Sequence, residues 1–307
     1  MNKIAAVVTT YNRLELLKEN VEALLNQSYN EFDIIIVDNN STDSTESYVK
    51  SVADTRVRYF NTGANLGGAG GFSFGIKKAI ELEYDFVWIM DDDTIPTKDA
   101  LKEIIDKSRA LSNDFSFLAS TVYWKDGTLF PMNYPRIAPN VQLYPEIEKL
   151  RDYKLLPIVN CSFVGCYVNL KYAKKVGLPY AEYFIYGDDA EYTTRLRKEA
   201  KAYWVLDSTL VHKAPSKIGS NVVNAPIERI ERFYMQTRNG IHLHRKHGGV
   251  WNYILILLQR LKNILLHSPD YKMKRVYVVV KGFFAGLFFN PVIKYVIEEG
   301  KEKTKNV

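Results

Sequence analysis

The chain has 307 residues, of which 47% are hydrophobic, 13% aromatic and 25% charged, an ordinary globular composition that excludes collagen-like, coiled-coil and wholly disordered chains. Its net charge of +6 is unevenly spread, because residues 1–212 carry 24 Lys and Arg against 29 Asp and Glu, whereas residues 213–307 carry 17 against 6. The basic end predicts an anionic partner, either a nucleic acid or an anionic membrane face.

The first residues run directly into the short apolar segment Ile4–Val8, without the apolar core and cleavage site of a secretory leader. No stretch of 18 uninterrupted apolar residues follows that could cross a membrane. The two cysteines, Cys161 and Cys166, are too few for a disulfide scaffold and lack the partner pair of a zinc site. Together these features predict a cytoplasmic protein.

Residues 1–95 alternate continuous apolar segments with helical patterns. Strands are expected at Ile4–Val8, Phe32–Val37, Val57–Phe60 and Phe86–Met90, and helices at Arg13–Asn26, at 44–52, and from the end of a Gly-rich loop at 63–71 to about Glu83. Strands that are apolar throughout are typical of a parallel sheet covered by helices on both faces. The pattern predicts an α/β fold, with residues 1–95 as the nucleotide-binding half of a doubly wound sheet.

Residues 96–225 are expected to complete this domain with a mixed pattern. Helices are expected at about 97–111 and 188–199, and strands near 115–123, 158–168 and 202–206. Between them, residues 125–157 contain five prolines and little periodicity, which predicts a long loop bordering a site.

Residues 226–307 change character and are expected to form a basic, amphipathic helical region. Ile227–Lys246 is predicted as a basic helix, and Trp251–Leu266 gathers its polar residues within one face. Val276–Tyr295 is apolar and aromatic, interrupted by Lys281, Asn290 and Pro291. Two interpretations stay open: a small soluble helical bundle, or helices lying in a membrane interface with Lys and Arg at the headgroups.

Three consecutive acids, Asp91, Asp92 and Asp93, end the strand expected at Phe86–Met90. Three carboxylates at the end of a buried strand repel one another unless a cation compensates them, and hard oxygen ligands favour Mg²⁺ or Mn²⁺. Open α/β sheets also bind ligands at this edge. The triplet therefore predicts a divalent metal site, and an acidic turn with capping roles is the alternative.

The Gly-rich segment Asn65–Phe72 contains four glycines in five positions before a helix. Gly67, Gly68, Gly70 and Gly71 would let backbone N–H groups approach an anion closely. The segment fits neither the P-loop nor the dinucleotide fingerprint. Beside a metal site, it is expected to hold a diphosphate.

A second acidic pair, Asp188 and Asp189, opens the helix expected at 188–199. Helix capping is one interpretation, and a general base with a neighbouring acid that orients it is the other. His212 follows the last strand and is a candidate metal ligand, whereas His242, His244 and His247 on the basic helix are expected at a surface or interface.

These motifs, in this order, resemble glycosyltransferase family 2, the inverting nucleotide-sugar transferases of the GT-A fold, over about residues 1–245. Val7–Arg13, which includes Thr10, Tyr11 and Arg13, is similar to the opening strand and nucleotide loop of that family, and Val37–Asp43, which includes Asp38, to its second nucleotide motif. Asn65–Phe72 is most similar to galactofuranosyltransferases and next to rhamnosyltransferases. Gly187 departs from that branch, which tends to have Trp before the acid pair, and Asn39 stands where many relatives carry a second Asp.

The resemblance implies that Asp91, Asp93 and His212 hold Mn²⁺ or Mg²⁺, that Asp92 faces the donor sugar and that Asp189 is the base. It implies UDP-galactofuranose as the donor, with dTDP-rhamnose or another hexosyl donor as the alternative. The implied acceptor is a glycan or a lipid-diphosphate-linked glycan of a bacterial cell surface. The basic C-terminal region would then hold a peripheral enzyme on the inner face of the plasma membrane.

Two other functions fit these residues less well. The acids miss the last residue of the D-x-D-x-[TV] pattern of haloacid-dehalogenase-type phosphatases, because Ile95 stands there. A non-catalytic, membrane-associated sugar-binding subunit would not need the intact acids. No nucleic-acid-binding module is recognisable, so no nucleic acid is expected as a partner. A homo-oligomer stays open.

Overall fold

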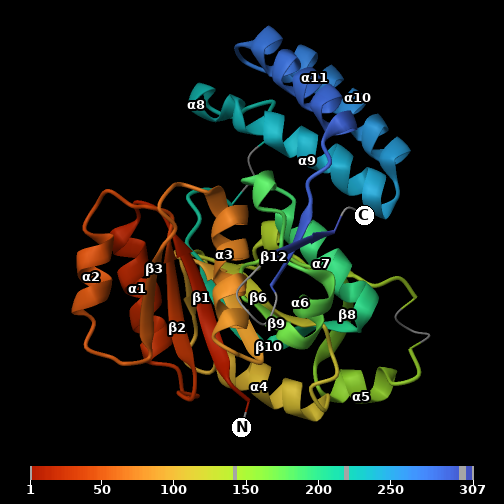
Figure 1. Cartoon of the computed structure of the whole chain (residues 1–307). Coiled ribbons are helices and arrows are strands. Elements are labelled where there is room, and N and C mark those ends of the chain that lie inside the picture. The colour runs from red at the N-terminus through yellow and green to blue at the C-terminus, as the bar shows by residue number, and fades with distance from the viewer. Residues whose placement is uncertain (1, 141–143, 218–220, 297–301, 306–307) are drawn as a thin grey trace.

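The computed structural model describes residues 2–140, 144–217, 221–296 and 302–305 (Figure 1). Its strands are β1 (Ile4–Thr10), β2 (Asp33–Asp38), β3 (Val57–Asn61), β4 (Phe86–Asp91), β5 (Thr94–Pro96), β6 (Phe117–Trp124), β7 (Arg136–Ile137), β8 (Leu155–Asn160), β9 (Cys166–Asn169), β10 (Ala202–His212), β11 (Ile293–Val296) and β12 (Glu302–Lys305). Its helices are α1 (Leu14–Leu25), α2 (Thr45–Ser51), α3 (Gly67–Glu81), α4 (Ala100–Ala110), α5 (Ile147–Asp152), α6 (Leu170–Val176), α7 (Asp188–Glu199), α8 (Ile227–Ile230), α9 (Arg232–His247), α10 (Val250–His267) and α11 (Lys272–Phe288).

One large mixed sheet organises the described residues up to His212, with strand order β3-β2-β1-β4-β9-β6-β10-β8-β7, and β5 pairs with β10 beside this order. The pairings among β1, β2, β3 and β4 are parallel, whereas β9 runs antiparallel between β4 and β6. Alternate residues of β1 face opposite sides: Ala6 and Val8 pack with α1 and α4, and Ala5 and Val7 pack with α3. Both faces are therefore apolar, which confirms the predicted α/β architecture and places the site at the carboxyl edge of the parallel strands.

Four expectations about elements in this domain are corrected. The single strand expected at 158–168 is two strands, β8 and β9, because the chain turns at Gly165, whose φ is +73°. The strand expected at 202–206 continues as β10 to His212, across an irregularity between Val205 and Thr209. The loop expected at 125–157 contains β7 and α5 and runs into β8. The Gly-rich loop ends at Leu66, and its four clustered glycines form the first turns of α3.

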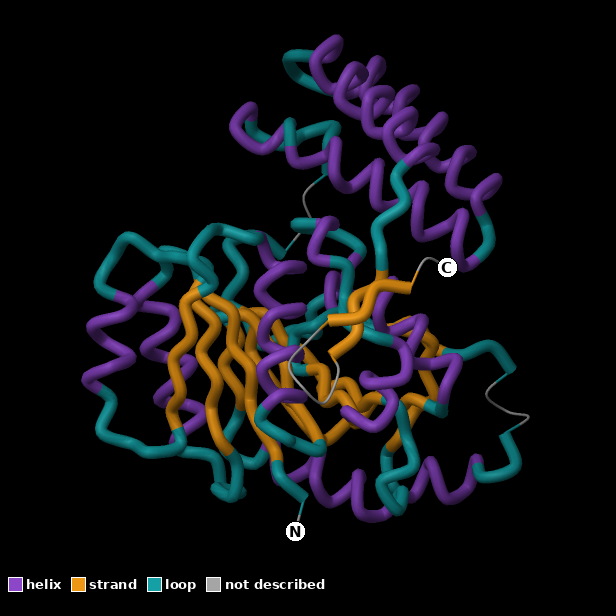
Figure 2. Tube along the Cα trace, viewed as in Figure 1, coloured by secondary structure: helices purple, strands orange, loops and turns teal. Residues whose placement is uncertain are grey.

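The C-terminal helices α8 to α11 pack together beyond the carboxyl edge of the sheet (Figures 1 and 2). They bury a cluster of their own that includes Phe233, Ile241, Leu257 and Val279. The basic helix expected at Ile227–Lys246 is divided into α8 and α9. In the apolar segment Val276–Tyr295, the helix ends at Phe288, before Pro291. Strand β11 follows and pairs with β12. Across the described ranges, the hydropathy and length of the helices give no candidate for a membrane-spanning segment.

Candidate active site

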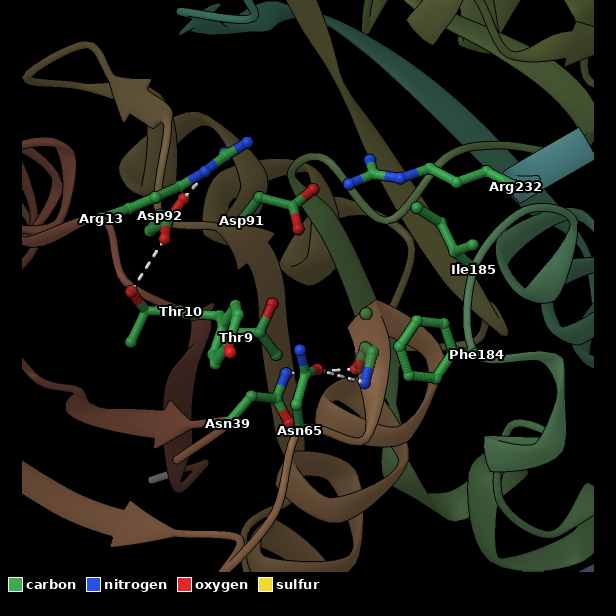
Figure 3. Close-up of a pocket in the computed structure, with 13 residues that line it drawn as sticks. Thr9, Thr10, Arg13, Asn39, Asn65, Asp91, Asp92, Phe184, Ile185 and Arg232 are labelled. Carbon is green, nitrogen blue, oxygen red and sulfur yellow. Dashed lines mark hydrogen bonds and ion pairs between the residues drawn. The ribbon is translucent and has the colours of Figure 1, made fainter. Parts of the chain in front are cut away.

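A pocket of about 340 Å³ opens at the carboxyl edge of β1 and β4 (Figure 3). Its lining combines residues from both strand ends, the first turn of α3, the loop before α7 and the first residue of α9. These residues are Thr9, Thr10, Tyr11, Arg13, Asn39, Asn65, Gly67, Gly68, Asp91, Asp92, Phe184, Ile185 and Arg232. Because the N-terminus of a helix favours anions, Gly67 and Gly68 give the pocket an anion-attracting wall opposite the acids.

The acids at the end of β4 are held by Arg13 and Thr10. Thr10 Oγ1 donates a hydrogen bond of 2.8 Å to Asp92, and Arg13 Nη1 lies 2.9 Å from Asp93 and 3.3 Å from Asp92. Burial raises the pKa of Asp92 to about 6, although Arg13 and Thr10 act in the opposite direction. Burial, with the neighbouring charge of Asp93, raises the pKa of Asp91 to about 7. The edge thus concentrates carboxylates whose ionisation a cation would favour.

The side chains of Asp93 and His212 fit neighbouring ligands of a divalent cation. His212 Nδ1 lies 2.9 Å from Asn133 Oδ1, which can only accept, so Nδ1 donates there and Nε2 is the ring nitrogen that faces Asp93. Nε2 lies 3.1 Å from Asp93 Oδ1, a buried oxygen without a hydrogen-bond partner among the described residues. Ligands at right angles on a cation with bonds of about 2.1 Å lie about 3 Å apart. In the described ranges no three Asp, Glu, His or Cys side chains already converge around one point, so the role of Asp91 as a third ligand stays a prediction.

The second acid pair begins α7, where the helix N-terminus stabilises negative charge. Asp188 is 8% exposed, whereas Asp189 is half-buried and accepts a hydrogen bond of 2.7 Å from the backbone of Ala190. Burial raises the pKa of both carboxyls, and Asp189 and Asp91 add to the effect at Asp188. Because the charge of Asp91 affects the pKa of Asp188, the two acid motifs lie within electrostatic reach of each other. Gly187 adopts φ +82°, a conformation that glycine takes readily and Trp does not.

The structure separates the predicted donor-binding residues into two groups. Thr10, Tyr11, Arg13, Asn65, Gly67, Gly68 and Asp92 line the pocket, as does the predicted metal ligand Asp91. Asp38, Gly70 and Gly71 do not line it. The carboxylate of Asp38 accepts hydrogen bonds from Tyr59 Oη at 2.6 Å and the backbone of Ser41 at 2.8 Å. Gly71 packs against β1 and β2, where a Cβ atom would lie 2.9 Å from Asn39 Nδ2.

Five lining residues were not predicted: Thr9, Asn39, Phe184, Ile185 and Arg232. Thr9 and Asn39 adjoin predicted residues at strand ends, so the strand pattern could have found them. Asn39 donates to the Gly67 carbonyl at 3.1 Å, and its Oδ1 is buried without a partner in the described part of the chain. Phe184 and Ile185 lie in an irregular loop with no motif. Arg232 starts α9 and reaches toward Asp91 across the pocket (Figure 3), a placement that only tertiary structure reveals.

The His residues of α9 differ from one another in burial. His242 is buried, 2.6 Å from Tyr183 Oη, and burial lowers its pKa to about 4. His247 Nε2 lies 3.1 Å from the buried carboxylate of Glu191. His244 stacks on Tyr253 with ring centroids 4.4 Å apart. The expected interface residues therefore face the acid-pair helix and the helical bundle.

Comparison with known proteins gives one family and several relatives. The family model described as Glycosyl transferase family 2 matches residues 5–177. Galactofuranosyltransferase GlfT1 of Mycolicibacterium smegmatis is 28% identical over 199 residues, which are 63% of this chain and 65% of the relative. A Campylobacter jejuni GalNAc(5)-diNAcBac-PP-undecaprenol beta-1,3-glucosyltransferase is 32% identical over 111 residues, 35% of each chain. The chain thus spans just under two thirds of the first relative and about a third of the second.

Solved structures share the fold at low sequence identity. Staphylococcus aureus TarS 1–349 in complex with UDP superimposes with a TM-score of 0.55 at 17% identity, covering 92% of this chain and 70% of that one. GalNAc-T7 with UDP, GalNAc and Mn²⁺ gives a TM-score of 0.59 at 14% identity, covering 80% of this chain and 48% of that one. These likenesses confirm the GT-A-like α/β fold.

Proposed function

The chain belongs to glycosyl transferase family 2, and we propose that it transfers a sugar from a nucleotide sugar to an acceptor hydroxyl with inversion at the anomeric carbon. The observation that carries this proposal is the meeting, in one pocket, of Asp91 and Asp92 of the acid triplet with Gly67 and Gly68 at the N-terminus of α3. Carboxylates suit a divalent cation and the helix N-terminus suits a phosphate, so the pocket matches a metal diphosphate.

In this proposal Asp91, Asp93 and His212 hold Mn²⁺ or Mg²⁺. When bound, such a cation neutralises negative charge on the leaving diphosphate. Arg13 keeps Asp92 and Asp93 in place through its 3.3 Å and 2.9 Å contacts. Arg232, which has no ion pair within the described ranges, is available to the diphosphate on the opposite side of the pocket.

The base of the nucleotide would be bound by Asn39. Its Nδ2 already donates to the Gly67 carbonyl. Its buried Oδ1 has no partner among the described residues and could accept from the ring N–H of uracil or thymine. Asp92, beside Thr10, would face the donor sugar. This arrangement orients the donor without distinguishing UDP from dTDP.

Asp189 would remove the proton from the acceptor hydroxyl as its oxygen attacks the anomeric carbon from the face opposite the diphosphate. A single displacement of this kind inverts the anomeric centre. Asp188, almost fully buried next to it, would orient Asp189. A positioned base of this type contributes about 10²–10⁴-fold to the rate.

We propose UDP-galactofuranose as the donor, with dTDP-rhamnose as the competing candidate. Two observations support galactofuranose: the motif Asn65–Phe72, and relatives named galactofuranosyltransferase GlfT1 in Mycolicibacterium smegmatis and Mycobacterium tuberculosis. Gly187 shapes the acceptor side differently from that branch, so the acceptor is proposed only as a glycan, either free or linked to a lipid diphosphate.

The C-terminal helices support an acceptor at a membrane surface. Ten large apolar side chains of α10 and α11 are exposed: Trp251, Leu255, Ile256, Leu258, Leu265, Leu266, Met273, Tyr277, Phe284 and Phe288. Neither helix contains Asp or Glu, and both carry Lys and Arg. An apolar face with a basic border suits the interface of an anionic bilayer. We propose that this face binds the inner leaflet of the plasma membrane, in bacterial cell-surface polysaccharide synthesis.

A thermal-shift panel with Mn²⁺ tests the reaction class and the donor together. The ligands are UDP, dTDP, GDP, UDP-galactofuranose, UDP-galactose, UDP-glucose and dTDP-rhamnose. A ligand at a hundred times its Kd stabilises the native state by about 2.7 kcal/mol. We expect UDP to raise the melting temperature only with metal, and UDP-galactofuranose to raise it further. A preference for dTDP-rhamnose would retain the reaction and change the donor, whereas no shift with any nucleotide would contradict the transferase and favour a non-catalytic sugar-binding role.

A further inference from the structure

The loop before the acid pair has an unusual backbone. Phe184 and Tyr186 have φ values of 62° and 72°, in the left-handed region that aromatic residues rarely adopt, and Gly187 follows at 82°. This loop carries Phe184 and Ile185 into the donor pocket and leads directly into Asp188. A conformation of this kind persists only where surrounding contacts hold it, so the contacts of this loop decide the shape of the site.

On one side the loop is held by the first turn of α3. Ala69 N donates to the Phe184 carbonyl at 3.1 Å. Gly67 lies so close that a Cβ atom there would meet the same carbonyl at 2.2 Å. The glycine therefore allows the donor wall and the acid-pair loop to touch directly.

On the other side the loop is held by one amide side chain of α9. Asn239 is fully buried, and its Nδ2 lies 3.0 Å from the carbonyls of Tyr183 and Ile185 and 2.9 Å from that of Tyr186. Its Oδ1 accepts from Arg238 Nε at 2.9 Å, which fixes the orientation of the amide. Two amide hydrogens thus serve three carbonyls of the strained turn, and few other side chains offer two donors in this geometry.

Other residues of α9 also contact the loop before the acid pair and the start of α7. Arg238 donates to the Glu182 carbonyl at 2.7 Å, and its guanidinium stacks 3.9 Å from the ring centroid of Phe289. His242 contacts Tyr183, and His247 contacts Glu191 in the first turn of α7, as described above. Residues spaced three or four apart share a helix face, so one face of α9 backs both the loop and the start of the acid-pair helix.

We propose that Asn239 is a positioning residue for the transfer reaction. By donating to the carbonyls of residues 183, 185 and 186, it holds the loop in the conformation that presents Phe184 and Ile185 to the donor and Asp189 to the acceptor. This inference rests on the proposed function for the identity of the ligands. It also means that the C-terminal helical region builds part of the active site, in addition to its exposed apolar face.

The test compares two variants of Asn239 with a control in the full-length chain. Asn239→Asp keeps the shape and removes the amide donors, and Asn239→Ser keeps a single donor. Ile241→Ala is the control: Ile241 is fully buried on α9 and contacts Gly286 of α11, away from the loop. For each protein we would measure the melting temperature, hydrogen exchange of a peptide covering residues 182–190, and the Kd of UDP with Mn²⁺.

We expect Asn239→Asp to speed exchange in the loop peptide about tenfold and to weaken UDP binding about tenfold, as loss of a buried hydrogen-bond donor predicts. Asn239→Ser should have a smaller effect on both, and it carries the test if the Asp variant does not fold. Ile241→Ala should lower the melting temperature while leaving loop exchange and UDP affinity within about twofold of wild type.

If the Asn239 variants lower only the melting temperature, like the control, Asn239 stabilises the bundle and the positioning role is wrong. If the wild-type protein binds no UDP, the proposed function fails, and the exchange measurement alone still decides whether Asn239 holds the loop. The two failures are therefore distinguishable.

Discussion

The acidic edge of the sheet and the outer face of α10 and α11 depart from ordinary burial in opposite directions. This acidic edge comprises Asp91–Asp93 after β4 and the acid pair at the start of α7, and in it Asp92, Asp93 and Asp188 are 2%, 4% and 8% exposed. On the outer helices, Trp251 and Phe288 are 77% and 85% exposed. Burying a carboxylate costs free energy unless it is paired, and exposing a large apolar side chain forgoes the gain of burial.

The proposed partners would account for both departures. A cation that also binds a diphosphate would compensate the carboxylates, and an apolar, anionic surface would cover the helices. Strands β1 and β2 show the contrast, since nearly all their residues are buried and they need no partner. Regions where a sequence violates the burial rules are therefore where we expect ligands to act.

The largest expected effect tests the acidic edge. Asp189→Asn keeps the shape of the side chain but removes the base, so turnover should fall by at least about 10²–10⁴-fold. UDP affinity should be unchanged, because Asp189 does not line the donor pocket. Turnover is measured by UDP release and affinity by calorimetry.

Glu199→Gln is the matched control for that experiment. It makes the same chemical change at the other, exposed end of α7. Its turnover should equal that of the wild type. Retained turnover in Asp189→Asn would contradict the assignment of the base and move attention to Asp188.

Much of the acidic edge was predictable because its signals are local. Fully buried parallel strands appear as continuous apolar runs, so β1, β2 and β4 were found, and the acids that follow β4 mark the ligand edge. The turn at Gly165 was missed because apolar residues lie on both sides of it. The glycines at the start of α3 suggested a loop, since glycine is a poor helix former. The close packing of Gly67 against Phe184 and of Gly71 against Asn39 requires glycine at those two positions.

The rest of the site depends on contacts between residues far apart in the chain. Arg232 reaches the pocket, and Asn239 holds the loop of Phe184, only because α9 packs against that loop. On the sequence alone, both belong to a basic amphipathic helix whose partner is unspecified. Periodicity predicts that such a helix has a buried face, and tertiary structure decides what lies on it.

The second prediction tests the outer helices. The double variant Trp251→Glu and Phe288→Glu places negative charge on both helices where the apolar face is most exposed. Binding to vesicles of phosphatidylcholine with phosphatidylglycerol should weaken at least about tenfold, because apolar insertion and attraction to anionic lipid are both reduced. Co-sedimentation measures the bound fraction, and wild-type binding should also weaken with added salt.

Gln259→Glu is the control, because it introduces negative charge at an exposed polar position of α10. It should retain most of the binding. Equal binding by the double variant and the wild type would show that this face does not meet the bilayer. If the wild-type protein binds none of the vesicles, the result would favour a soluble helical bundle.

The smallest expected effect returns to the acidic edge and concerns stability. Burial raises the pKa of Asp188 well above its usual range, so above the ordinary carboxyl pKa the unfolded chain loses this proton more readily than the folded one. Ionising Asp188 therefore lowers the free energy of unfolding as the pH rises toward the raised pKa. Asp188→Asn should increase the free energy of unfolding of the metal-free protein by about 1 kcal/mol at pH 8, and by less at pH 5, while turnover falls.

Urea denaturation at the two pH values measures this difference, and Asp126→Asn is a control of opposite sign. Lys217 lowers the pKa of the exposed Asp126 to about 2, so its ionised form is already favoured in the folded state and its removal should not stabilise the protein at either pH. If Asp188→Asn destabilises the protein equally at pH 5 and pH 8, the buried carboxylate is compensated within the chain. The cost of burying Asp188 would then be offset by contacts within the protein, and the parallel with the exposed helices would fail on that side.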